Sequence, residues 1–203
     1  GKCDSLVYFS RDSTIQLYNE PVLWSEINQM SADYIEMKTN APAPDEVHLN
    51  NNAFIISKQD SVMFDQVKGK KMTGYIVEKQ LDHIFVDGNG QTIYYARDKD
   101  NIIGLNRAES SKIVIKFRDG KIFRIAFLGN PEGKLNPIPL LKEEERRLNG
   151  FDWKEAIRPA SRTDIFRKTM ETPENKEKKM DAAAPAEEKR EQKDDGETEG
   201  LRD

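Results

Sequence analysis

The sequence predicts an all-β fold whose sheets are largely antiparallel or stacked as a jelly roll. Between about residues 5 and 128, short apolar or alternating runs follow one another at the spacing typical of β proteins. No stretch between them shows a convincing helical period or has the length of a helical crossover between parallel strands. Two of the runs, 41 positions apart, end in Gly-Asn, at Gly88-Asn89 and Gly129-Asn130. Such a recurring strand-and-turn unit favours a binding scaffold over an enzyme.

The predicted strands number roughly a dozen, and turn-forming residues separate them. In chain order they cover residues 6–9, 14–18, 22–24, 34–37, 47–49, 53–57, 61–67, 72–77, 81–86, 92–96, 104–106, 112–117 and 122–128. Asp119-Gly120 is a strong hairpin signal, because glycine accepts the positive backbone angles that tight turns need. Gly88-Asn89-Gly90 is also predicted to be a hairpin turn, because the helix that follows a phosphate-binding loop is missing.

The repeated unit extends beyond its Gly-Asn end. Residues 116–121 precede the second copy as residues 75–80 precede the first, so each unit is a strand, a polar turn and a second strand. A looser third copy leads from residues 32–37 through a proline-containing loop to residues 47–52. The sequence therefore predicts two copies, with a third as an open alternative.

Alternation gives each predicted strand one apolar side. Ile113, Ile115 and Phe117, for example, alternate with Lys112 and Lys116. The simplest interpretation is that these apolar sides close the core of a sandwich. The alternative is that they line a groove open to a ligand.

The chain changes character after residue 130. Pro131, Pro137 and Pro139 cannot donate to a β-ladder and are predicted to end the sheet. Residues 140–148 are predicted to form a short helix that ends at Asn149-Gly150. Asp152 is predicted to cap another short turn over residues 152–155. This closing segment should be held on the sheet by its large apolar side chains, Trp153, Ile157, Ile165 and Phe166.

The C-terminal residues 167–203 carry 9 basic and 12 acidic side chains and almost no large apolar ones. Such a segment cannot bury enough surface to offset the ordering entropy, so a disordered tail is predicted. The expected organisation is therefore a β-domain over residues 1–130, a closing segment over 131–166 and a charged tail over 167–203.

Composition excludes several classes of function. The formal net charge is −4, so no basic field favours nucleic acid as a partner. Cys3 is the single cysteine, and no Cys/His spacing predicts a metal site or another cofactor. His48 and His83 have no nucleophile at an interpretable spacing and are predicted to be surface histidines. No apolar run approaches the roughly 20 residues of a membrane span, and the start of the chain suggests that an upstream portion has been removed.

A family resemblance comes from residues 64–76, 81–89 and 91–95, together with residues 12–37 and 158–166. Within residues 12–37, Leu17 to Trp24 is followed by Met30 to Ile35. The closing stretch runs from Arg158 to Phe166. These stretches resemble the OstA-like (organic solvent tolerance) proteins of Bacteroidetes-type bacteria, which are related to periplasmic lipopolysaccharide-transport proteins. The resemblance covers about residues 4–166 and rests on strand patterns, without a catalytic signature.

The resemblance implies a twisted, partly open β-jellyroll whose apolar interior holds lipid acyl chains and which catalyses no reaction. It implies a periplasmic protein, free or associated with the outer membrane. Its implied partners are lipopolysaccharide or lipid A, and other transport β-jellyroll domains or a second copy joined by strand addition. The closing segment and the charged tail depart from the single-domain members of the family.

On this basis the apolar sides of the strands become candidate lipid-binding residues, because each buried methylene contributes roughly 0.8 kcal/mol. The candidates are Trp24 near one mouth, and Phe64, Ile76, Ile84, Val86, Ile93, Ile113, Ile115, Phe117, Ile125 and Phe127 along the interior. Two other classes stay open. One is a structural or interaction module of the envelope with a filled core, and the other is a carbohydrate-active enzyme with converging carboxylates.

Overall fold

The computed structural model describes residues 1–39, 43–99, 101–161 and 163–164. Contacts within the chain divide it into a unit Gly1–Ile165 and a second unit, Phe166–Asp203. The predicted charged tail, Ile165 and Phe166 lie outside the described residues. Within the first unit the strands pair antiparallel throughout, which confirms the all-β prediction.

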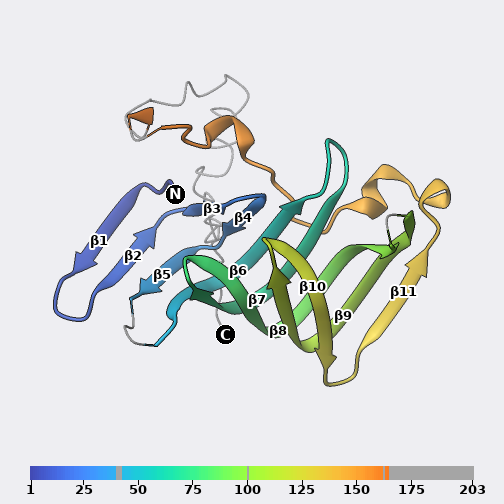
Figure 1. The fold of residues 1–203 in the computed structure, drawn as a ribbon, viewed down its shortest axis with the longest axis horizontal. Helices are drawn as coiled ribbons and strands as arrows, with labels where there is room; N and C mark the ends of the chain where they lie inside the picture. Colours follow the sequence, from blue (N-terminus) through green and yellow to red (C-terminus); the bar gives the residue numbers. More distant parts are fainter. Residues whose placement is uncertain (40–42, 100, 162, 165–203) are drawn as a thin grey trace, which may run out of the picture. The chain divides into compact units, whose positions relative to one another are not determined.

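The sheet contains eleven strands, with β1 at one end and β10 and β11 at the other (Figure 1). Their order is β1-β2-β5-β6-β7-β8-β9-β10, while β4 joins β3 to β6 and β11 pairs with β9. The strands are β1 (Ser5–Phe9), β2 (Thr14–Tyr18), β3 (Val22–Ser25), β4 (Asn28–Ser31), β5 (Tyr34–Lys38), β6 (Asp45–Lys58), β7 (Phe64–Val77), β8 (Gln80–Asp98), β9 (Asn101–Arg118), β10 (Lys121–Leu128) and β11 (Glu132–Asn136).

The four long strands β6 to β9 each take part in two leaves of the sheet. The first leaf contains β1, β2, β5 and β10 with residues 45–50, 71–77, 80–87 and 112–118 of the long strands. The second leaf contains β3, β4 and β11 with residues 53–58, 64–69, 90–98 and 101–110. The pairing register shifts where each of β6, β7 and β8 passes from one leaf to the other.

Paired residues with positive φ mark these corners. Asn51-Asn52 in β6 have φ of 58° and 48°, Gly88-Asn89 in β8 have 79° and 51°, and Gly129-Asn130 between β10 and β11 have 79° and 48°. Glycine and asparagine tolerate this left-handed region, and a bulge made of two such residues turns the strand without ending it. The third repeat copy, left open from sequence, therefore has the same corner geometry as the other two.

The prediction of a hairpin turn at Gly88–Gly90 is wrong, because these residues are a corner inside β8. For the same reason, eight of the predicted runs join pairwise into the four long strands. The predicted hairpin at Asp119-Gly120 is present between β9 and β10. Two short polar strands, β4 and β11, carry too little apolar alternation to have been predicted.

Pro131 does not end the sheet, contrary to the prediction. It lies just before β11, outside the ladder, so its missing N–H breaks no pair between β11 and β9. The sheet ends at Asn136, after which Pro137 and Pro139 begin the closing segment.

Between residues 137 and 158 the closing segment contains three short 3₁₀-helices, η1 (Ile138–Leu140), η2 (Glu143–Arg146) and η3 (Glu155–Ile157). The continuous helix predicted over residues 140–148 is therefore wrong, because extended Leu141 and Lys142 separate η1 from η2. Asp152 does not cap η3, which begins after Lys154. We call residues 138–157 the strap, because they return from the β11 end of the sheet toward the N-terminus (Figure 1).

Two apolar layers stabilise this unit. The inter-leaf layer contains Leu17, Ile35 and Ile115 of the first leaf with Met30 and Ile55 of the second. The strap layer lies on the other face of the second leaf, where Phe54 and Tyr95 pack with Leu148 of the strap. Residues 53–57 are buried on both sides, which explains why this run is continuously apolar up to Ser57 rather than alternating.

Candidate functional site

The centre of the inter-leaf layer is closed. Ile84, Ile113 and Ile115 are fully buried at 0 % exposure, and Val86 is buried beside them. Their partners across the layer include Ile55 and Val67 of the second leaf. The middle of this layer is therefore a packed core.

One end of the same layer opens into a pocket beside β1, which we call the β1 pocket. It has a volume of about 320 Å³ and collects apolar side chains from β1, β2, β3 and β5. Its lining residues are Gly1, Lys2, Cys3, Leu6, Ile15, Leu17, Leu23, Met37 and Pro159. Ile15, Leu23 and Met37 are half-buried and pack against the closed centre, so the pocket continues the layer outward.

The other end opens into a second space, the β10 pocket, of about 260 Å³. Ile122, Ile125 and Phe127 of β10 face Tyr94 and Ala96 of the second leaf across it. Phe123, Arg124 and Asn106 complete the lining. The candidate site is thus an apolar layer that is filled in the middle and hollow at both ends.

A polar contact joins the two leaves between these ends. The buried Asn28 amide, at the start of β4, donates to the carbonyl of Gly120 at 3.1 Å. The hydroxyl of buried Ser57 donates in turn to the Asn28 side-chain oxygen. Because Gly120 belongs to the hairpin between β9 and β10, this contact holds the edge of the first leaf against the second.

Eight of the eleven predicted lipid-binding residues belong to the inter-leaf layer. Ile84, Val86, Ile113, Ile115 and Phe117 form the closed centre. Ile125 and Phe127 line the β10 pocket, and Ile76 is half-buried at the margin of the layer.

Phe64 and Ile93 lie elsewhere, so the expectation that they face the same interior is wrong. Both belong to the strap layer, where the Phe64 ring lies 5.4 Å from the rings of Phe151 and Trp153. Sequence alternation could not reveal this, because both faces of the second leaf are apolar. Trp24 is half-buried and does not line the β1 pocket, whereas its neighbour Leu23 does.

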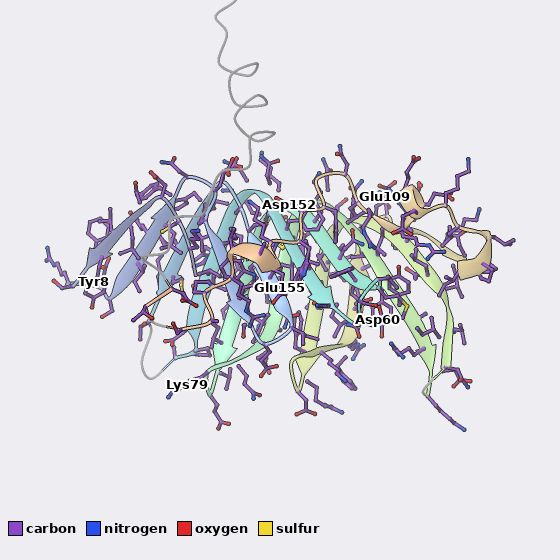
Figure 2. All side chains as sticks on the ribbon, turned by 90° about the horizontal axis from the view of Figure 1, so that it is seen from above. Tyr8, Asp60, Lys79, Glu109, Asp152 and Glu155 are labelled. Atoms are coloured by element: carbon purple, nitrogen blue, oxygen red, sulfur yellow. The ribbon has the colours of Figure 1, made fainter. Side chains whose placement is uncertain are left out.

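Two buried glutamines fix the strap to the second leaf. Gln66 donates to the carbonyl of Arg146 at 2.8 Å and accepts from the Leu148 N–H at 2.8 Å. Gln29 donates to the carbonyl of Asp152 at 2.7 Å and accepts from the Lys154 N–H at 2.7 Å. Each amide pairs with the strap backbone as a neighbouring strand would. In Figure 2, Asp152 and Glu155 lie over the strands, between Tyr8 at the β1 end and Glu109.

Asp65 is a buried carboxylate at the start of β7. It accepts from the Tyr95 N–H at 2.9 Å and from the Gln59 side chain at 2.8 Å. Burial raises the pKa of Asp65 to about 7, although the hydrogen bond from Tyr95 and the charge of Arg97 oppose this shift. The carboxylate lies where β7 has stopped pairing with β8, so it supplies the acceptor that the ladder lacks.

The outer edge of β1 is an exposed apolar strand. Leu6, Val7, Tyr8 and Phe9 are 41–59 % exposed, and among the described strands β1 pairs on one side only, with β2. An edge of this kind offers unpaired backbone groups and apolar side chains to another strand.

A carbohydrate-active enzyme would need a cleft with converging carboxylates or a metal site. A hollow of about 560 Å³ beside β9 and β11 includes Glu109, Glu132 and Glu145, but Arg107 and Lys134 interleave with them and all five are exposed to solvent. Among the described residues, no group of three or more His, Cys, Asp or Glu could hold a metal ion.

The two histidines lie in strands of the first leaf. His48 contacts Glu46 at 2.8 Å, and His83 contacts Asp82 at 2.6 Å and stacks on Tyr75.

Within the described part of the chain, no helix is long and apolar enough to cross a membrane.

The fold is similar to that of LptH, the LptA-homologous periplasmic component of the conserved lipopolysaccharide transport device from Pseudomonas aeruginosa. The match has a TM-score of 0.52 at 11 % sequence identity and covers 67 % of this chain and 93 % of that chain. No family model matches the sequence, and no curated protein matches it. The comparison therefore shows the partly open β-jellyroll fold, whereas the OstA-like family suggested by the sequence stays a prediction.

Proposed function

We propose that this protein is a non-enzymatic carrier or bridge for lipopolysaccharide in the Gram-negative envelope, acting in the periplasm. The observation that carries this proposal is the apolar layer between the two leaves, which is hollow at both ends. The fold is shared with a periplasmic component of a lipopolysaccharide transport device, which supports the same reading.

Acyl chains would enter at the two pockets rather than along the whole interior. The pocket walls are half-buried aliphatic and aromatic side chains, and an acyl chain gains roughly 0.8 kcal/mol for each methylene that it buries there. To occupy the closed centre, a chain would have to part the leaves and break the Asn28–Gly120 hydrogen bond that joins them.

The exposed edge of β1 supports a second element of the proposal, which is docking to another β-jellyroll domain or to a second copy. Strand addition would pair the free backbone groups of β1 and cover Leu6, Tyr8 and their neighbours. The strap does not block this edge, because it packs on a face of the second leaf.

Photocrosslinking to lipopolysaccharide in a Gram-negative host tests the carrier role. A photoreactive residue at Ile125 or Leu23, in the two pockets, should crosslink lipid, whereas one at exposed Lys70 of β7, which lines neither pocket, should not. These positions are preferable to Ile84 and Ile115, because a bulky or charged group at a fully buried site would disrupt the core. Equal crosslinking at all three positions, or none at the pockets in folded protein, would contradict the proposal.

A second candidate is a structural or interaction module of the envelope, and the packed centre of the inter-leaf layer favours it. In that case the β1 edge would recruit a partner, and native mass spectrometry of the purified protein would show no bound lipid. Co-purification of lipid A-like material would instead favour the carrier.

A further inference from the structure

The hairpin of β9 and β10 places like charges directly opposite each other. Arg118 pairs in register with Lys121, and Lys116 pairs with Arg124. All four side chains are exposed, and no described carboxylate forms an ion pair with any of them. Like charges in directly opposed strand positions repel each other, so this arrangement is destabilising unless an anion lies between them.

Acidic residues do not offset this cluster within the hairpin. Between residues 112 and 128 the chain carries five cationic side chains and one acidic one, Asp119. The fifth cation, Lys112, has its own partner, because its ammonium lies 3.8 Å from the Asp87 carboxylate. Glu26 lies against Gly120 at the tip of the hairpin. The four unpaired cations therefore form a local positive patch on a chain whose net charge is negative.

The same edge joins this patch to the β10 pocket. A bulge between Ile122 and Arg124 inserts Phe123, which is 55 % exposed, into the margin of the pocket. The Arg118 guanidinium lies 3.8 Å from the centroid of the Phe123 ring, and Arg124 contributes to the pocket lining. Two guanidinium groups, those of Arg118 and Arg124, therefore lie at the margin of the apolar space.

We infer that the β10 pocket takes an anionic amphiphile, with its apolar tail between the leaves and its phosphate or carboxylate head on Arg118, Lys121 and Arg124. This inference rests on the proposed function and adds the chemical class and orientation of the ligand. Guanidinium groups bind both head groups through paired charge-assisted hydrogen bonds, and phosphate offers the additional acceptor oxygens.

Binding of three twelve-carbon probes to the full chain tests the inference. Dodecyl phosphate, dodecanoate and uncharged dodecyl maltoside are titrated at low salt by calorimetry. The Arg118→Gln/Arg124→Gln double variant should bind dodecyl phosphate about tenfold more weakly, which corresponds to the loss of one charge-assisted hydrogen bond. Its affinity for dodecyl maltoside should not change. The Lys70→Gln/Lys71→Gln variant makes the same charge change at an exposed corner of β7 and should leave both affinities unchanged. Dodecanoate shows which of the two heads the patch prefers.

The outcomes separate this inference from the proposed function. Equal affinities of the wild type for dodecyl phosphate and dodecyl maltoside, or equal losses in the two double variants, would overturn the anionic head site and leave the carrier role standing. A further variant, Ile125→Glu, places a charge in the wall of the pocket and should weaken the binding of all three probes. Loss of phosphate binding in the arginine variant without any effect of Ile125→Glu would keep the head site and contradict acyl binding in the pocket. If no probe binds, both are overturned.

Discussion

The two apolar layers of this protein consist of the same kinds of side chain but end differently. The strap layer is covered by the chain itself, and the buried Gln29 and Gln66 fix that cover through hydrogen bonds to its backbone. The inter-leaf layer is packed at its centre and hollow at both ends, where most of the apolar side chains that line it are half-buried. Apolar alternation predicts both layers equally well. The polar groups at the margins decide which layer is closed.

The centre and the end of the inter-leaf layer should respond differently to loss of side-chain volume. Ile115→Ala should lower the free energy of unfolding by about 3–5 kcal/mol, because the cavity that it leaves at a fully buried site cannot collapse. Ile125→Ala, at the β10 pocket, should cost under about 1.5 kcal/mol, because a half-buried site loses less transfer free energy. Urea denaturation measures both. Equal losses would show that the pocket behaves as core.

The strap should depend on its glutamines more than on its length. Gln66→Ala leaves the Leu148 N–H and the Arg146 carbonyl without their partner, so we expect a loss of about 2–4 kcal/mol. Limited proteolysis should then cleave residues 138–157 before the sheet. Gln80→Ala, at an exposed position of β8, is the matched control and should change neither stability nor cleavage. A strap that stays protected in Gln66→Ala would show that Leu148, Phe151 and Trp153 suffice to hold it.

Much of the fold could be predicted because strand alternation and turn chemistry are local signals. The burial of Ile113, Ile115 and Phe117 opposite exposed Lys112 and Lys116 follows the predicted alternation directly. The corners could not be recognised, because Gly88-Asn89 has the composition of a hairpin turn and differs from one only in what pairs on either side. That information comes from β7 and β9, which are far from it in sequence.

The candidate site was predictable only in part. Ile125 and Phe127 were identified, but the β1 pocket was missed because Ile15, Leu23 and Met37 come from three short strands without a common pattern. Phe64 and Ile93 were assigned to the interior because the strap that covers them lies about 55–85 residues further along the chain. The opposed cations of the hairpin had a sequence signal, since Asp119-Gly120 fixes the register in which Arg118 meets Lys121.

The smallest expected effect is the pH dependence of the free energy of unfolding. It distinguishes Asp65 from the two buried glutamines of the second leaf. Gln29 and Gln66 do not titrate, whereas burial raises the pKa of Asp65 to about 7 from 3.8. A carboxyl whose pKa is higher in the folded state binds more protons than in the unfolded state, so stability should fall as the pH rises from about 4 to 7 and then level off. Asp65→Asn keeps an acceptor for the Tyr95 N–H and cannot ionise. Between pH 5 and pH 8 the wild type should therefore lose about 1–3 kcal/mol more of its free energy of unfolding than Asp65→Asn does, as measured by urea denaturation. If Asp65→Asn and the wild type showed the same pH dependence, another group would be responsible for the titration. The stability of the strap layer would then not depend on the ionisation of Asp65.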